Sequence, residues 1–242
     1  MTTFFDHLAA LRSKLLLCFF AVVVGAGIAH AFHVTIIATL LMPVRGQSLV
    51  FLSPLDPLVF IFKIDLVAGL LLALPVISWS TLSFLRPAMR PVRWTAFCAV
   101  FTLAAVLLLA GLAYSYLVVV PLTLRFLLSI SVAGIGNMLT ASSYLSFLLL
   151  QLLLMAALFQ IPLFILAGVW IGAFDPSALA AKRRYIYVGG LIALAVVTPT
   201  TDVFSLGVVA VPALFIFEGS LLAARVVGRF RHVQTLGSGG RD

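Results

Sequence analysis

Long stretches without any charged residue recur along the whole chain, and they limit its possible folds more than any other feature. One of them includes all residues from Ser143 to Phe174. A soluble domain needs polar residues to cover its surface, yet 64% of this sequence is apolar and only 9% is charged. A secretory signal would instead give one short apolar core followed by a soluble remainder. The sequence therefore predicts a polytopic membrane protein.

Six transmembrane helices are predicted, because one crossing takes about 20 apolar residues. Backbone groups in lipid must be paired internally, which favours helices for runs this apolar. The alternating pattern of a membrane β-barrel is not seen in the sequence. The fold class is thus all-α, with spans near Leu15–Phe32, Pro57–Trp79, Trp94–Val118, Tyr144–Ile171, Tyr185–Val197 and Val203–Ala223.

The basic residues predict the orientation of these spans, since cytoplasmic loops are rich in Lys and Arg. Arg45 and Arg125 lie on one side, and Lys63 lies near a membrane end. The other side holds most of the fifteen Lys and Arg residues: Arg12, Lys14, Arg86, Arg90, Arg93, Lys182, Arg183, Arg184, Arg225, Arg229, Arg231 and Arg241. Both termini are therefore expected in the cytoplasm, with residues 1–225 as one transmembrane domain and 226–242 as a basic, disordered tail.

Two of the predicted spans are short and one is long. The long uncharged stretch exceeds a perpendicular crossing, so that helix is expected to tilt or bend at Pro162. The apolar segments on either side of Asp202 are barely long enough to cross, and they are expected to form a tight hairpin around residues 198–202. Such a short pair implies a locally thinned bilayer or helix ends below the far surface.

Several function classes find no support in the residues. Cys18 and Cys98 each lie in an apolar stretch without a neighbouring His or Cys, so neither a metal site nor a cofactor is expected. His30 and His33 share a helical face, but two imidazoles make a poor metal site and favour interfacial packing. The positive charge marks topology and not a nucleic-acid surface. The sequence shows neither a nucleophile–base pair nor a nucleotide-binding loop, so it gives no indication of an enzyme.

A series of short motifs follows in a consistent order along the chain. They are HLAALRSKL (7–15), FLRPAM (84–89), AYSY (113–116) with Pro121, YLSF (144–147), FQIP (159–162), KRRY (182–185), Thr198–Pro199 with DVFS (202–205), and Pro212 with Phe217–Glu218. In these motifs and their order the chain resembles the TatC family, the core subunits of the Sec-independent, or twin-arginine, protein translocase.

The resemblance implies a receptor in the bacterial inner membrane that recognises twin-arginine signal peptides of folded cargo. It implies single-span partners of the TatA and TatB type, a homo-oligomer within a larger complex in the lipid bilayer, and transport driven by the protonmotive force. The signal would bind to the amino-terminal segment and the first cytoplasmic loop. The matching positions here are His7, Leu8, Leu11, Arg12, Phe84, Pro87 and Arg93.

The chain departs from the family pattern at three acidic positions. The family glutamates of the amino-terminal segment and first loop are Ala10 and Val92 here, and the glutamate of the fourth helix is Gln160. Carboxylates pair well with guanidinium groups, so these changes weaken the expected grip on a signal's arginines. Asp6 lies one helical turn from Ala10 and can partly substitute. The alternative hypothesis is a scaffold that binds partners but has lost direct signal recognition.

A set of intramembrane polar residues is expected to dock partner helices: Gln160, Thr198, Pro199, Asp202 and Glu218. Each also has a structural interpretation. Gln160 would bond to a neighbouring helix, Thr198 and Asp202 would cap the hairpin, and Glu218 would pair with an Arg such as Arg225.

Two further ionisable residues, Lys63 and Asp65, lie in the second predicted span. Either Lys63 snorkels to the interface while Asp65 caps or faces a neighbour, or the two form an interior polar site. An interior polar site would fit a third hypothesis, a small-molecule or ion transporter. Against that hypothesis stand the missing inverted repeat and the scarcity of intramembrane charge.

Overall fold

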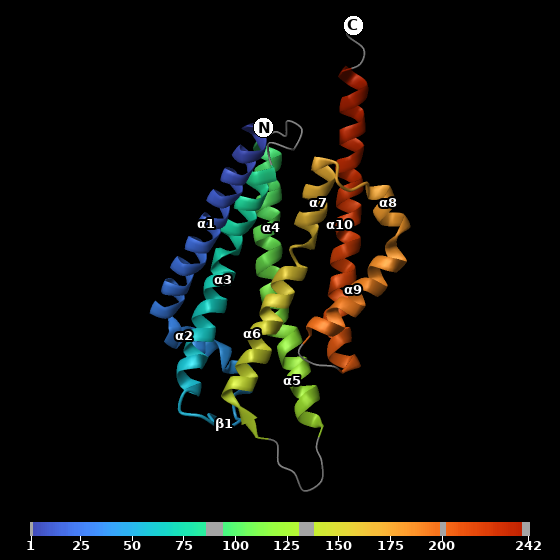
Figure 1. The fold of residues 1–242 in the computed structure, drawn as a ribbon. Coiled ribbons are helices and arrows are strands. Elements are labelled where there is room, and N and C mark those ends of the chain that lie inside the picture. The colour runs from blue at the N-terminus through green and yellow to red at the C-terminus, as the bar shows by residue number, and fades with distance from the viewer. Residues whose placement is uncertain (1, 86–93, 131–137, 199–201, 239–242) are drawn as a thin grey trace.

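The computed structural model describes residues 2–85, 94–130, 138–198 and 202–238, and the side chains of 12–83, 98–130, 138–169, 171–198 and 202–225. Figure 1 shows a bundle of long helices with a short sheet at one end. In chain order the elements are α1 (Thr2–Ala31), α2 (His33–Leu40), η1 (Met42–Val44), β1 (Leu49–Val50), α3 (Asp56–Leu85), α4 (Trp94–Tyr114), η3 (Ser115–Val119), α5 (Val120–Ser129), β2 (Leu139–Thr140), α6 (Ala141–Leu158), α7 (Ile161–Ile171), α8 (Pro176–Ala181), α9 (Arg183–Val197) and α10 (Val203–Ser238).

The predicted all-α membrane fold is confirmed. Within the described residues, five helical segments are long and apolar enough to cross a membrane: Arg12–Ala31, Asp56–Ser83, Cys98–Ser129, Ala141–Val169 and Val203–Arg225. The remaining predicted span, the fifth, corresponds to α9, which has only 15 residues. The end of α9 and the start of α10 lie higher in Figure 1 than the far ends of α5 and α6, as a short hairpin requires.

The bend expected near Pro162 is present as a break between α6 and α7. Pro162 lies in the first turn of α7, where its missing N–H costs no helical hydrogen bond. Just before it, Gln160 N–H donates to the Ala157 carbonyl at 3.0 Å, a bond one residue shorter than in an α-helix. The long uncharged stretch therefore crosses as two helices joined by a tightened turn.

Two predicted boundaries are wrong. The third span continues to Ser129 instead of ending near Val118, because a π-helical segment, η3, precedes Pro121 and connects α4 directly to α5. The last helix continues to Ser238, so residues 226–238 are helical and not a disordered tail. Between residues 226 and 236 the sequence has one glycine, Gly228, and no proline, so the helix can continue through this segment. The apolar part of α10 has 23 residues, against 28 to 32 for the three spans before it.

Helices α1 and α3 cross at backbone contact distance. A Cβ added to Gly69 on α3 would lie 2.5 Å from the Ala26 nitrogen on α1, and one added to Gly25 would lie 2.7 Å from the Gly69 carbonyl oxygen. Small residues allow such close approach between membrane helices, where van der Waals packing drives association. The two glycines therefore fix how α1, with its amino-terminal segment, sits on the bundle.

The end of the bundle farthest from the amino terminus is closed by the segment between α1 and α3. Strands β1 and β2 pair in parallel, with Leu49 opposite Leu139. The hydroxyl of Tyr144, a fully buried residue of α6, donates to the Leu40 carbonyl at 2.6 Å. Tyr116 donates in the same way to the carbonyl of Thr39 at 2.5 Å. These contacts satisfy carbonyls at the end of α2 that would otherwise have no partner in the helix.

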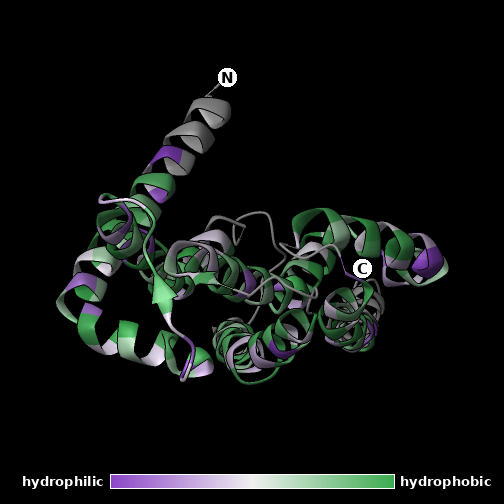
Figure 2. Cartoon of the chain, turned by 90° about the horizontal axis from the view of Figure 1, so that it is seen from below, coloured by the Kyte–Doolittle hydropathy of each residue, from purple (hydrophilic) through white to green (hydrophobic). Residues whose placement is uncertain are grey.

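Large apolar side chains cover the outside of the helices. Val196, Leu117 and Leu109 are 79%, 69% and 66% exposed, and many others resemble them. Figure 2, which looks along the bundle from its lower end, shows apolar residues around the helices as well as between them. Such surfaces are stable in lipid and not in water, so the structure agrees with a membrane protein.

Candidate functional site

The amino-terminal segment expected to bind a signal peptide forms the first turns of α1. His7, Leu8 and Leu11 lie within this helix, although their side chains, like that of Ala10, lie outside the description. The side chain of Arg12 is exposed. Helical spacing places Leu8, Leu11 and Arg12 on one face, three and four residues apart. The helix thus presents these positions together.

The end of α3 and the start of α4, between which the first loop lies in the sequence, are at the same end of the bundle as the start of α1 (Figure 1). Phe84 belongs to the last turn of α3, with its side chain outside the description. Pro87, Val92 and Arg93 lie outside the described residues. The fold therefore places the backbone of Phe84 at the end where α1 begins, and how the loop side chains meet α1 stays a prediction.

Glu218 pairs with an arginine, but not with the one expected. Its Oε2 accepts from Arg183 Nη2 at 2.9 Å, and its Oε1 accepts from the Tyr187 hydroxyl. Arg225 is the wrong partner because it lies seven residues further on the same helix, about 10 Å along its axis. Arg183 and Tyr187 both belong to α9, so this cluster fastens α9 to α10.

The expectation that Gln160 bonds to a neighbouring helix is confirmed. It is 5% exposed and lies in the break between α6 and α7, where its Nε2 donates to the Ala104 carbonyl of α4 at 3.1 Å. Its Oε1 is buried and has no hydrogen-bond partner among the described residues. The side chain therefore connects two helices and retains one unused acceptor, and partner docking at this position stays a prediction.

The turn between α9 and α10 is capped as the sequence indicates. Asp202 Oδ2 accepts from Ser205 N–H at 2.6 Å and so caps the amino end of α10. Thr198 is buried, and its N–H donates to the Leu194 carbonyl at 2.8 Å, at the carboxyl end of α9. Pro199 lies outside the described residues. The capping role expected of Asp202 is therefore confirmed, whereas the Thr198 bond is made by the backbone and the role of its side chain stays a prediction.

The ionisable residues of α3 face two different neighbours. Asp65 Oδ2 lies 2.7 Å from His30 Nδ1 on α1, and the His30 ring stacks on His33 with 5.2 Å between centroids. Lys63 Nζ donates to Ser146 Oγ on α6 at 2.9 Å. The expectation that Asp65 faces a neighbour and that the histidines pack together is confirmed. Lys63 is half-buried and reaches an exposed serine on a neighbouring helix, so both alternatives for this residue stay open.

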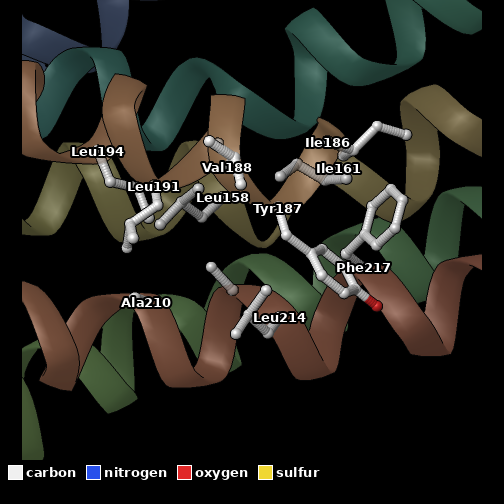
Figure 3. A pocket seen from close by; sticks show the side chains of 12 residues that line it. Leu158, Ile161, Ile186, Tyr187, Val188, Leu191, Leu194, Ala210, Leu214 and Phe217 are labelled. Carbon is white, nitrogen blue, oxygen red and sulfur yellow. The ribbon is translucent and has the colours of Figure 1, made fainter. Parts of the chain in front are cut away.

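Sequence reasoning missed an apolar cavity of about 240 Å³ between α9, α10 and the α6–α7 break. Figure 3 shows Val188 and Leu191 pointing from α9 toward α10, from which Leu214 points back. Its walls also include Leu158 and Ile161, on either side of Gln160 along the chain. The only sequence signal was the glycine pair Gly189–Gly190, where an added Cβ would meet nothing within 4 Å. A site for an apolar side chain or helix thus lies among the predicted docking residues.

Comparison with known proteins gives a consistent result. The family described as Sec-independent protein translocase protein (TatC) matches residues 6–212. The TatC protein of Carboxydothermus hydrogenoformans is 28% identical, with 93% of each chain covered. The chloroplastic TATC protein of Arabidopsis thaliana is 31% identical over 94% of this chain and 67% of its own.

The fold also matches a solved structure. A crystal structure of the twin-arginine translocase receptor TatC in DDM superposes with a TM-score of 0.81 and 29% identity. The match covers 90% of this chain and 99% of that one. The sequence match, the fold and the order of the spans agree, and the chain belongs to the TatC family of Sec-independent protein translocase proteins.

Proposed function

We propose that this chain is the core receptor subunit of a twin-arginine translocase in the bacterial inner membrane, with both termini in the cytoplasm. In this role it binds the signal peptides of folded cargo, and the protonmotive force drives their transport. The observation that carries the proposal is the match along nearly the whole length of a solved twin-arginine translocase receptor. As a translocase subunit it is a transport component, and it needs no catalytic residue.

The signal-binding surface consists of the start of α1 and the first loop. Their described parts lie at one end of the bundle, on α1 and at the end of α3 (Figure 1). Leu8, Leu11 and Arg12 supply one helical face, and Phe84, Pro87 and Arg93 supply the loop side. A signal's apolar segment would lie on Leu8 and Phe84, while Asp6 supplies the carboxylate that Ala10 and Val92 lack.

Partner subunits with a single span would dock on the α9 side of the molecule. The support is twofold: the apolar cavity and the exposed surface of α9, on which Val196 is 79% exposed. A partner helix would bury this apolar surface, and the α6–α7 turn would have to open before a donor reached the buried Oε1 of Gln160. Further copies of the chain would join the same complex within the bilayer, and no nucleic acid takes part.

Site-specific photo-crosslinking tests the receptor role. A photoreactive residue at Leu8 or Phe84 should crosslink to a precursor with a twin-arginine signal in membranes that hold the partner subunits. The same residue at Leu52, which is 77% exposed at the opposite end of the bundle, is the matched control and should not crosslink. A complete lack of crosslinks at Leu8 and Phe84 would contradict the receptor role.

A second candidate is a scaffold that assembles partners without gripping the signal, and it is favoured by one observation, the neutral residues Ala10 and Val92. It predicts co-purification with single-span partners but no export in a strain that lacks its own copy. In that case Ala10→Glu with Val92→Glu should recover export, because the carboxylates restore the arginine pairing. Ala10→Gln with Val92→Gln is the control of similar size. Export by the unchanged chain would rule out this candidate.

A further inference from the structure

A second cavity lies outside the signal-binding surface and the α9 side. It has a volume of about 650 Å³ and lies between α3, α5 and α6, at the end of the bundle farthest from the amino terminus. Its polar side chains are Lys63 of α3 and Ser142, Ser143, Tyr144 and Ser146 of α6. The Tyr144 hydroxyl already donates to the Leu40 carbonyl. The wall therefore contains one positive charge and three serine hydroxyl groups, and no carboxylate among the described residues.

The charge of Lys63 is not balanced by any described residue. Its ammonium group donates to Ser146 Oγ, which itself donates to the Ser142 carbonyl at 2.8 Å. Asp65 cannot be the counter-ion of Lys63, because it lies about 200° around the helix from Lys63 and pairs with His30. A half-buried ammonium with one neutral acceptor is costly unless an anion or water joins it. The geometry around Lys63 therefore favours a bound anion.

The serines suit a phosphate group. The Thr140 hydroxyl oxygen accepts from Ser143 N–H at 3.2 Å, and the Thr140 hydroxyl proton is donated to Ser143 Oγ. The proton of the Ser143 hydroxyl therefore remains free to turn toward the cavity. Several donors around one cation match the several oxygens of a phosphate, and charge-assisted hydrogen bonds of this kind are strong.

The rest of the wall is apolar and points to a lipid as the source of that phosphate. Leu124 and Leu127 line it from α5, and Phe147 and Leu150 line it from α6. Lys63 lies seven residues inside the first residue of α3, about 10 Å along the axis, so the cavity opens near the membrane surface and follows the helices inward. A free ion would leave this apolar wall unoccupied, whereas an acyl chain would cover it.

We propose that this cavity binds a phospholipid from the leaflet at this end of the bundle. The phosphate lies against Lys63 and the serines of α6, and an acyl chain lies along Leu127 and Leu150. The lipid would hold α3, α5 and α6 together at a place where the protein itself supplies no ion pair among its described residues. This site is independent of the proposed receptor role.

Native mass spectrometry of the full chain in a neutral detergent tests the site. Phosphatidylglycerol should bind at a saturable site, and diacylglycerol with the same acyl chains should bind at least about tenfold more weakly. Lys63→Gln should weaken phosphatidylglycerol by a similar factor, while Lys63→Arg retains binding. Arg125→Gln removes a cation of α5 that does not line the cavity, and it should change nothing.

Three results would overturn the proposal. Equal binding of diacylglycerol would exclude the phosphate, and binding of inorganic phosphate as tight as that of phosphatidylglycerol would exclude the lipid. An equal loss in Arg125→Gln would mean that diffuse charge attracts the lipid. If Lys63→Gln does not fold, a photoreactive phosphatidylglycerol on the unchanged chain decides: labelling should fall on peptides that contain Leu127 or Phe147, and labelling confined to other peptides would contradict the site.

Discussion

At the residue scale, the polar side chains of the membrane region mainly form hydrogen bonds and ion pairs between helices. Gln160 connects the α6–α7 break to α4, and Asp65 connects α3 to α1. Their types and positions were visible in the sequence, but most of their partners were not. Hydropathy shows that a polar residue lies in a span, whereas its partner depends on how helices pack, which a single sequence leaves open.

Glu218→Gln should loosen α9 from α10, because it removes the charge that both Arg183 and Tyr187 contact. Since Arg183 and Glu218 side chains are each 36% exposed, we expect a loss of only about 1 kcal/mol in the free energy of unfolding. Thermal unfolding of the purified protein in detergent measures it.

Arg225→Gln is the matched control for this change, since Arg225 is an exposed arginine of the same helix that makes no ion pair with Glu218. It should leave the unfolding temperature unchanged. A loss as large as that of Glu218→Gln would mean that Arg225, and not Arg183, is the partner that matters.

At the element scale, the spans followed from length and hydropathy, and the short irregular elements did not. All six predicted spans correspond to helices, because paired backbone in lipid leaves few alternatives. Helix α2 and strands β1 and β2 were not foreseen, since two-residue strands form only where the chain around them is already in place. The third span was predicted to end near Val118, but the π-helical segment η3 before Pro121 lets the helix continue to Ser129.

The close crossing of α1 and α3 gives a prediction for single glycines. Gly69→Ala adds a Cβ at 2.5 Å from the Ala26 nitrogen, so the helices must separate. We expect a loss of about 1–3 kcal/mol in the free energy of unfolding, as for other overpacked contacts. The measurement is again thermal unfolding in detergent.

Gly27→Ala is the control, because Gly27 lies on α1, the helix that Gly69 contacts, and an added Cβ there meets nothing within 4 Å. It should leave stability equal or slightly higher, since alanine favours a helix more than glycine does. Equal losses at Gly27 and Gly69 would show that the close crossing of α1 and α3 does not explain the effect.

At the scale of the whole molecule, the described starts of α1 and of α4 and the end of α3 share one end, while a sheet and buried tyrosines close the other (Figure 1). The motif order predicted the family, and the comparisons confirmed it. The two cavities could not be predicted, because each is formed by residues from three or more helices that are distant in the sequence. A receptor with separate surfaces for signal, partner helix and lipid is the account that these features support.

Transport itself tests this account most directly. Inverted membrane vesicles would carry this chain and its single-span partners in place of the host's own subunits, with a folded cargo added outside. We predict that a twin-arginine precursor becomes protected from protease, and that protection is lost with an uncoupler or with a twin-lysine signal. Equal protection of the twin-lysine precursor, or none for the twin-arginine one when the complex is assembled, would contradict the account.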